Sequence, residues 1–152
     1  MKITQAKIND ALAILNLQKL AYQSEAERYH DFKIPPLTQT LSEVKEQFKT
    51  NIFLKAVKKE QTVGTVRAYK KDKTCHIGRL AVHPLFQKQG IGTALMQAIE
   101  AYFPQKRFEL FVGAKSDNNI NLYQKLGYKI YKKGKHEGTD IDIFYMEKLT
   151  GK

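Results

Sequence analysis

The stretch GRLAVHPLFQKQGIGTALMQAIEAYF, residues 78–103, constrains the fold of this chain more than any other. It predicts a short apolar strand that ends before Pro84, a loop with two glycines around Ile91, and an apolar helix. Glycines at this junction remove side chains from the place where a helix presents its free backbone N–H groups. The stretch therefore predicts a strand, loop and helix unit whose loop lets an anionic ligand approach the backbone.

Three phosphate-binding templates compete for this junction, and each requires different neighbours. A nucleotide-binding P-loop needs Gly, four residues, then Gly, Lys and Ser or Thr, a pattern that the chain does not contain. A dinucleotide-binding turn needs a third glycine where Leu95 stands, although Glu109 lies roughly where its ribose-binding acid would follow. The remaining template is a pyrophosphate cradle of consecutive backbone N–H groups, here from Gln87 to Thr93. A structural alternative stays open, in which the glycines only allow Ile91 to pack tightly beneath the sheet.

The segments before residue 50 indicate a strand followed by a helical arm. MKITQA alternates as a strand, and NDALAILNLQKLAY has a helical apolar face behind Asn9 or Asp10, either of which is expected to cap it. The Pro35–Pro36 pair is expected to break the arm, and a short helix capped by Thr40 or Ser42 should follow.

The later segments predict most of a sheet. IFLKAVKKEQTVGTVRAYK and KTCHIGRLAV are rich in β-branched and aromatic residues and have polar turns, so three antiparallel strands are expected. The helix after the glycine loop has apolar residues every four positions and ends at Pro104. RFELFV is a strand, NNINLYQKL a helix closed by Gly127, and YKIYKK with DIDIFYMEKL a final strand pair.

Length and composition fit one globular domain, residues 1–152. Apolar residues make up 42% and charged residues 27% of the chain, close to the globular average. A formal charge of +11 favours anionic partners. The lysines are dispersed, however, and no zinc-finger or RNP pattern occurs, so we do not expect nucleic acid to be the partner.

The cysteine content and the N-terminal segment bear on location and metal binding. Cys75 is the only cysteine, so an intrachain disulfide is excluded and no oxidising compartment is required. Cys75 beside His76 shows no zinc-ligand spacing with other residues, so no metal is expected. Polar residues interrupt the N-terminal apolar stretch, which fits neither a signal peptide nor a membrane span. We therefore expect a cytoplasmic protein that does not insert into a membrane.

Two motifs resemble signatures of one known family. LAVHPLFQKQGIGTALM resembles the coenzyme A motif of the GNAT superfamily of N-acetyltransferases, with Gln87, Gly90 and Gly92 at its fixed positions. NLYQKLGYKIYKK resembles the second signature of the family, an aromatic-bearing helix closed by Leu, Gly and an aromatic residue. The resemblance covers residues 50–148 and matches the order of the expected elements.

The resemblance implies a fold and a coenzyme site. The fold would be α/β, a GNAT-like arrangement with a mixed, mostly antiparallel central sheet, helices on both faces, and a splayed strand pair that forms the coenzyme cleft. Main-chain groups near Leu80, Ala81 and Val82 would pair with the pantetheine arm of acetyl-CoA. The family often has Asn and Ala where Ser116 and Asn119 stand here, and these two share a helical face with Tyr123. The implied coenzyme-binding residues are Leu80, Ala81, Val82, Gln87, Lys88, Gln89, Gly90, Ile91, Gly92, Thr93, Ser116, Asn119 and Tyr123.

Two residues are candidates for proton transfer. The resemblance implies that Tyr123 protonates the departing thiolate, although an aromatic residue at a helical core position is a simpler interpretation. His76 is the candidate base: strand alternation places it on the same side as Gly78 and Leu80, toward the cleft. HIGRLAVH also resembles a family stretch in which histidines remove the amine proton. A structural histidine stays open as an alternative, as does water relayed to acidic residues of the arm, Glu25 or Asp31.

These observations predict an N-acetyltransferase. The chain would transfer acetyl from acetyl-CoA to a primary amine of a small molecule or a peptide, by direct attack in a ternary complex and without a metal. The alternative is a non-catalytic GNAT-like module that binds coenzyme A as a sensor or an assembly part. The sequence does not identify the amine, and it is compatible with a homodimer.

Overall fold

A seven-stranded sheet forms the centre of the computed structural model, which describes residues 1–150. The strands lie side by side in the order β1-β2-β3-β4-β5-β7-β6, and only the β4–β5 pair is parallel. The predicted mixed, mostly antiparallel sheet is therefore confirmed. The strands are β1 Lys2–Gln5, β2 Ile52–Lys58, β3 Gln61–Lys71, β4 Thr74–Val82, β5 Arg107–Gly113, β6 Lys129–Lys135 and β7 Asp142–Leu149.

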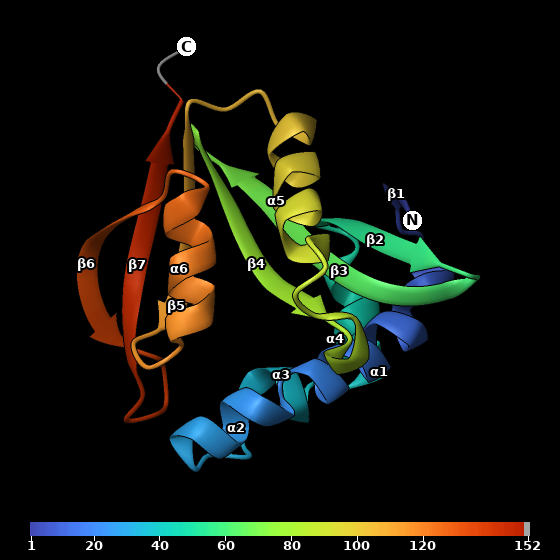
Figure 1. Ribbon diagram of the computed structural model, residues 1–152, viewed down its shortest axis with the longest axis horizontal. Coiled ribbons are helices and arrows are strands. Elements are labelled where there is room, and N and C mark those ends of the chain that lie inside the picture. The colour runs from blue at the N-terminus through green and yellow to red at the C-terminus, as the bar shows by residue number, and fades with distance from the viewer. Residues whose placement is uncertain (151–152) are drawn as a thin grey trace.

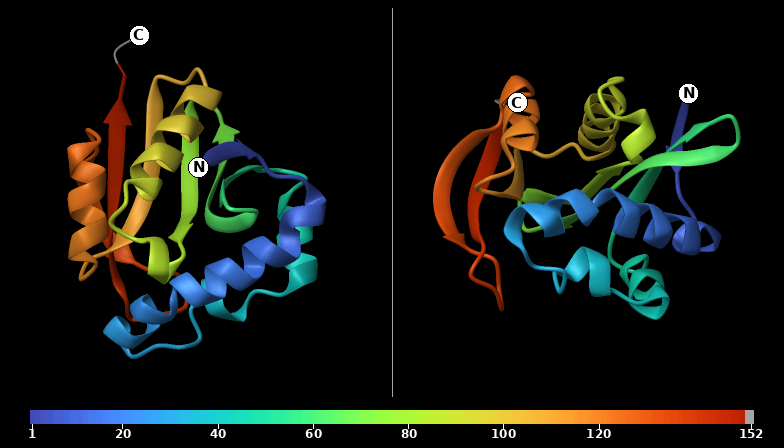
Figure 2. Two further views of the ribbon diagram at one scale, coloured as in Figure 1. Left: turned by 45° about the vertical axis from the view of Figure 1, so that its right-hand side comes forward. Right: turned by 60° about the horizontal axis from the view of Figure 1, so that its bottom comes forward.

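Helices cover both faces of the sheet (Figures 1 and 2), as expected. α5 packs against β2, β3 and β4 on one face, whereas α1 packs against β3 and β4 on the other. We call these the α5 face and the α1 face. The helices are α1 Ala11–Ala21, α2 Gln23–Tyr29, α3 Pro35–Thr38, α4 Leu41–Gln47, α5 Ile91–Tyr102 and α6 Asp117–Lys125, with two 3-10 turns, η1 Ile8–Asp10 and η2 Pro84–Phe86.

The main core lies on the α5 face. The predicted apolar stripe of α5 is buried there: Leu95 and Ile99 have no exposed surface. They pack with Phe108 of β5 and Met146 of β7, which are also buried, so one core joins both halves of the sheet. Burial of each such side chain stabilises the fold by about 1.5–3 kcal/mol. The core holds the start of α5, and with it the glycine loop, against the end of β4.

β4 and β5 separate soon after they meet. Their parallel pairing runs only from Thr74 with Arg107 to His76 with Glu109. Beyond this point the two strands diverge, as Figure 1 shows, while β4 continues to pair with β3 up to Val82. The splayed strand pair is therefore present, and it opens a gap in the middle of the sheet.

A β-bulge interrupts β4 close to this gap. Arg67 of β3 lies opposite Gly78 and Thr65 lies opposite Ala81, so the β4 strand carries an extra residue between these pairs. Arg79 takes up the extra length with a left-handed backbone, φ 54°. The bulge turns Leu80 to the α5 face, where it packs against the main core. The prediction that His76 and Leu80 share a face is therefore wrong, because strand alternation fails across a bulge.

The N-terminal arm also differs from the prediction. The Pro35–Pro36 pair starts the short helix α3 instead of breaking the chain, since proline is tolerated in the first turn of a helix. Asp10 stands at the N-cap of α1 without capping it; its carboxylate accepts hydrogen bonds from the Lys7 amide and the Lys55 ammonium. Thr40 caps α4 in a reciprocal pair with Glu43, as one of the two predictions stated.

Candidate active site

A cleft of about 510 Å³ lies where β4 leaves β5. Its walls come from the end of β4, the glycine loop, the first turn of α5, α6, and the α1–α2 junction. Its size is in the range of small-molecule sites. Most of the predicted coenzyme-binding residues line it, namely Leu80, Ala81, Val82, Gln87, Lys88, Gly90, Ile91, Gly92, Thr93, Ser116 and Asn119.

Two of the predicted coenzyme-binding residues do not line the cleft. Gln89 is turned away, and its side-chain oxygen accepts a hydrogen bond from the Lys58 ammonium at 3.2 Å. Tyr123 lies behind the wall with its ring in the main core. The Gln89 side chain therefore does not face the cleft, although its backbone belongs to the loop.

The glycine loop presents a row of free backbone donors. Within residues 1–150, none of the N–H groups from Gln87 to Thr93 donates to another backbone or side-chain group. Lys88 and Gly90 have left-handed backbones, with φ 63° and 84°, which curve the loop into the start of α5. A curved row of N–H groups at a helix N-terminus favours an anion. The loop therefore has the chemistry of the predicted cradle.

Gly92 keeps the cleft open beside this cradle. A Cβ atom at this position would lie 3.4 Å from Leu122 and 3.8 Å from Leu80, which form the two sides of the cleft. These are ordinary contact distances, so a larger side chain could be accommodated by the fold. It would, however, project between the two walls.

The phenol of Tyr123 lies near two residues that line the cleft, Tyr22 and Glu25. The side chain is 8% exposed, and burial raises the pKa of its phenol, with smaller contributions from nearby Tyr22 and Glu25. Both neighbours line the cleft. Its hydroxyl has no hydrogen-bond partner within residues 1–150, yet it is not among the fully enclosed polar atoms, so it reaches solvent. The phenol is therefore a protonated group behind the cleft wall, near Tyr22 and Glu25.

Helix α2 closes one side of the cleft through a polar contact to the α6 N-terminus. The Ser116 hydroxyl donates to a Glu25 carboxylate oxygen at 2.6 Å and lies 3.1 Å from the Tyr29 hydroxyl. The Tyr29 hydroxyl also accepts a hydrogen bond from the Lys115 amide. Gly113 is required here, since a Cβ atom would stand 2.1 Å from the Tyr29 oxygen. Glu25, an alternative proton acceptor in the sequence analysis, thus lies in the cleft.

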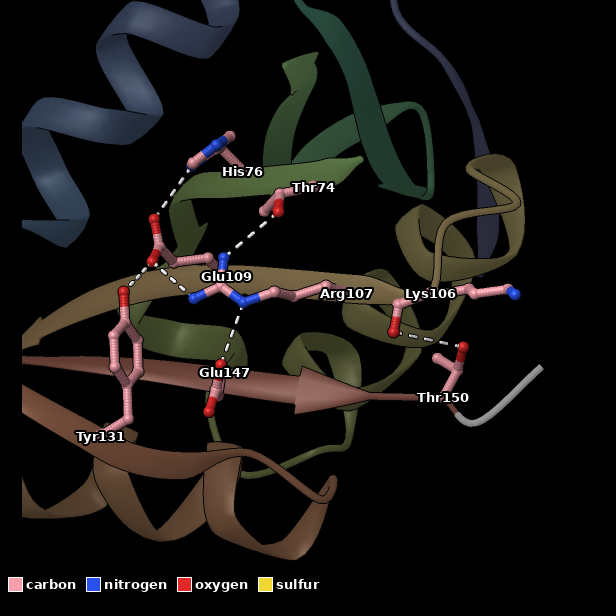
Figure 3. A network of polar contacts seen from close by, with 8 residues as sticks. All are labelled: Thr74, His76, Lys106, Arg107, Glu109, Tyr131, Glu147 and Thr150. Carbon is pink, nitrogen blue, oxygen red and sulfur yellow. Dashed lines mark hydrogen bonds and ion pairs between the residues drawn. The ribbon is translucent and has the colours of Figure 1, made fainter. Parts of the chain in front are cut away.

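His76 lies at the last position where β4 pairs with β5, on the α1 face. Its Nδ1 atom is 3.1 Å from a carboxylate oxygen of Glu109, directly across the β4–β5 pair (Figure 3). Its ring stacks on Tyr69, with centroids 5.0 Å apart. Its side chain is 27% exposed, and Nε2 has no partner within the part of the chain that the structure describes. In a neutral imidazole, a proton on Nδ1 would face the Glu109 carboxylate and leave Nε2 free to accept a proton.

Glu109 is held by two further side chains, as Figure 3 shows. Arg107 donates to it at 3.0 Å and also to Glu147 at 2.9 Å, and the Tyr131 hydroxyl donates to it from β6. Burial opposes ionisation of Glu109, but the hydrogen bonds from Tyr131 and Arg107 outweigh it and lower the pKa of the carboxyl below its usual value. The carboxylate is therefore ionised and fixed in position beside His76.

The sequence matches the model of the acetyltransferase (GNAT) family over residues 12–128, which include the glycine loop, His76 and Tyr123. The chain belongs to the GNAT family of acetyltransferases. It is therefore an acyltransferase by family. No curated protein matches the sequence significantly.

Solved structures share the fold of this GNAT protein over nearly its whole length. PaiA N-acetyltransferase from Thermoplasma acidophilum, solved with coenzyme A, has a TM-score of 0.75 at 19% identity and covers 98% of this chain and 99% of its own. Smu.2055 from Streptococcus mutans UA159 has a TM-score of 0.82 at 18% identity, with the same coverage. Aminoglycoside 6'-acetyltransferase type Ii has a TM-score of 0.73 at 24% identity, over 98% of this chain and 97% of that one.

The β4 carbonyls of the GNAT cleft are already engaged. The Tyr22 hydroxyl donates to the Leu80 carbonyl, and the Gln87 side chain donates to the Val82 carbonyl, each at 3.1 Å. A carbonyl has two lone pairs, so an incoming amide could share it. No local sequence signal pairs Tyr22 with Leu80, which lies 58 positions away.

Asp31 was a further candidate proton acceptor. It lies outside the cleft, in a second pocket with Tyr29 and Asp142, and accepts a hydrogen bond from the Lys33 amide.

Within residues 1–150, no three His, Cys, Asp or Glu side chains are placed to hold a metal ion. Over the same residues, no helix is long and apolar enough to cross a membrane.

Proposed function

We propose that this GNAT protein transfers acetyl from acetyl-CoA to a primary amine by direct attack in a ternary complex. The observation that carries the proposal is the row of free N–H groups from Gln87 to Thr93, which opens onto the cleft. These groups would hold the pyrophosphate, and Leu80 to Val82 would lie along the pantetheine arm. Coenzyme A in the solved Thermoplasma acidophilum structure supports the assignment of the ligand.

The amine would approach from the α1 face, through the gap that opens between β4 and β5. His76 stands at the edge of this gap, and its free Nε2 atom is suited to take a proton from the ammonium form of the acceptor. Glu109 would keep the Nδ1 proton in place and stabilise the imidazolium that forms. The neutral amine nitrogen then bonds to the thioester carbonyl carbon.

Loss of the coenzyme from this adduct requires cleavage of the carbon–sulfur bond. The departing thiolate needs a proton, and Tyr123 would supply it. Because its phenol has a raised pKa, it stays protonated throughout the physiological range. As the amide forms, the adduct nitrogen loses its second proton to the tyrosinate, directly or through water, which restores Tyr123. The products are the N-acetylated amine and free coenzyme A, and the imidazolium of His76 returns its proton to solvent.

The coenzyme assignment is tested with a substitution that fills the cleft. Gly92→Val should place methyl groups between Leu80 and Leu122 and displace the coenzyme. At 100 times its dissociation constant a ligand stabilises the folded protein by about 2.7 kcal/mol, so acetyl-CoA should raise the melting temperature of the wild type measurably. We expect Gly92→Val to lose most of this rise.

Gln97→Val is the matched control, because Gln97 is exposed on the same helix and receives the same β-branched side chain. It should keep the full rise in melting temperature. An unchanged melting curve for the wild type at saturating acetyl-CoA would contradict the assignment. A normal rise without acetyl transfer to any amine would instead favour the non-catalytic, coenzyme-binding alternative.

A further inference from the structure

Arg67 carries a half-buried positive charge with no partner. It extends from β3 on the α1 face, and no hydrogen bond or ion pair within residues 1–150 involves its side chain. A second guanidinium lies near it: Arg79, at the β4 bulge, donates to the Gln39 side-chain oxygen at 2.9 Å. Burial, and then the nearby Arg79, lower the pKa of Arg67 to about 10. Two guanidinium groups, of Arg67 and Arg79, therefore lie near each other on the α1 face, and neither is paired with a carboxylate within residues 1–150.

Two acidic side chains described above, Glu109 and Glu25, are engaged elsewhere. Glu109 accepts hydrogen bonds from Arg107 and Tyr131. Glu25 accepts from Ser116 and is paired with Arg28 of its own helix. Neither carboxylate is free to neutralise Arg67, so the positive charge is left for an external group.

Arg79 differs from Arg67 in having an evident structural role. The Gln39 oxygen that it contacts also accepts a hydrogen bond from Gln18, which donates in addition to the Pro36 carbonyl. These contacts tie the bulge to the N-terminal arm. Arg67 has no such contacts, and its guanidinium reaches solvent, since the only fully enclosed side-chain N or O atom without a partner in residues 1–150 is Nδ1 of His136.

The sheet register places Arg67 close to the candidate base. Tyr69 lies opposite His76 and Arg67 lies opposite Gly78, so Arg67 and His76 are diagonal neighbours on one face. Such neighbours have Cα atoms about 7–8 Å apart, within reach of one small molecule. Gly78 leaves the space between them open, since even an added Cβ atom would lie 3.8 Å from the Arg67 Nε atom.

We propose that Arg67 binds a carboxylate of the amine acceptor, whose amino group lies at His76. The substrate class would then be amino acids or other amines that bear a carboxylate, because a guanidinium binds this planar group through two parallel hydrogen bonds. Polycationic amines would be poor acceptors, since two arginines repel them. This inference rests on the proposed function and specifies its acceptor.

The test compares acceptors that differ only in the carboxylate. The probes are the common L-amino acids, the corresponding decarboxylated amines and carboxamides, and two polycations, spermidine and kanamycin. Initial rates of thiol release would be measured for the wild type, Arg67→Gln, and Lys70→Gln as the control. Lys70 is an exposed cation on the same strand, so this variant loses the same charge away from the site.

We expect the wild type to favour at least one amino acid over its decarboxylated counterpart. Arg67→Gln should lower kcat/KM for that amino acid about 10- to 100-fold, the usual effect of losing a charged hydrogen-bonding partner, and leave the counterpart nearly unchanged. Lys70→Gln should change neither. A preference for amines without a carboxylate, or an equal loss for both members of the pair, would overturn the inference while the proposed function stands.

Binding gives a readout that does not depend on acetyl transfer. Calorimetric titration of the free protein with the amino acids should detect at least one that binds more tightly than its decarboxylated amine, and Arg67→Gln should abolish the difference. Absence of any carboxylate-dependent binding overturns the inference even if the protein proves not to turn over. Carboxylate-dependent binding without turnover would support the Arg67 site and contradict the proposed activity alone.

Discussion

At the scale of single residues, the account depends on side chains whose properties follow from their surroundings. Tyr123 is suited to donate a proton because burial keeps its phenol protonated. His76 is suited to accept one because Glu109 occupies its Nδ1 atom. In the sequence, nothing next to Tyr123 or His76 predicts that either side chain is more reactive than any other tyrosine or histidine. Their roles arise from the cleft and from the β4–β5 pair.

Tyr123→Phe is the sharpest substitution at this scale. It keeps the ring and its packing while removing the proton donor. If chemistry limits turnover, we expect kcat to fall by about 10² to 10⁴ with little change in acetyl-CoA affinity. Tyr128→Phe is the control: this buried tyrosine packs beside Tyr123 but donates its hydroxyl proton to Glu100, so its loss should lower stability more than kcat. A Tyr123→Phe enzyme with more than about a third of wild-type turnover would show that another donor acts.

At the scale of elements, a network of side chains joins β4, β5, β6 and β7 on the α1 face (Figure 3). Its centre is Glu109, which touches His76, Arg107 and Tyr131, while Arg107 also reaches Glu147. β4 and β5 share only three paired positions, so these side-chain contacts reinforce a short junction. The same network thus stabilises the sheet and orients the candidate base.

The network should make stability depend on pH. The pKa of Glu109 is lower in the folded protein than the ordinary value of 4.5, so its contribution to the free energy of unfolding is complete above about pH 4.5 and is lost as the pH falls through the folded value. Urea unfolding at pH 7 and pH 3 should show that Glu109→Gln lowers stability by about 1 kcal/mol at pH 7 and has little effect at pH 3. Glu46→Gln removes an exposed pair with Lys49 and should have little effect at either pH. Equal losses from Glu109→Gln at both pH values would indicate a packing defect instead.

Local patterns were sufficient to predict most elements of this fold. The apolar repeat of α5, the polar turns of the β2–β4 meander and the closing Gly127, with φ 101°, all act within a few residues of one another. The bulge at Arg79 has no such local signal, because it depends on how β4 pairs with β3. The contacts from Tyr22 to Leu80 and from His76 to Glu109 join distant segments for the same reason. The sequence therefore indicated the glycine loop and His76, but it could not indicate the contacts of Tyr22 and Glu109 around them.

At the scale of the whole molecule, the proposed transfer would bring two ligands together across a divided sheet. The α5 face carries the cleft and the free amides, the α1 face carries His76 and Arg67, and the gap between β4 and β5 connects them. The lone cysteine is the first residue to consider as the carrier of a covalent acetyl group. Cys75 is fully buried, and burial, followed by the charge of Glu100, raises the pKa of its thiol to about 12. Cys75 is therefore poorly suited to carry an acetyl group, in keeping with the proposed direct transfer.

The measurement that tests this account most directly is the initial-rate pattern with both substrates varied. Acetyl-CoA and the best amine would each be varied at several fixed concentrations of the other, and the intact mass of the protein would be recorded after incubation with acetyl-CoA alone. Direct attack in a ternary complex predicts double-reciprocal lines that intersect and a protein mass without an added acetyl group. Parallel lines, together with a stoichiometric acetyl-enzyme that an amine discharges, would contradict the account.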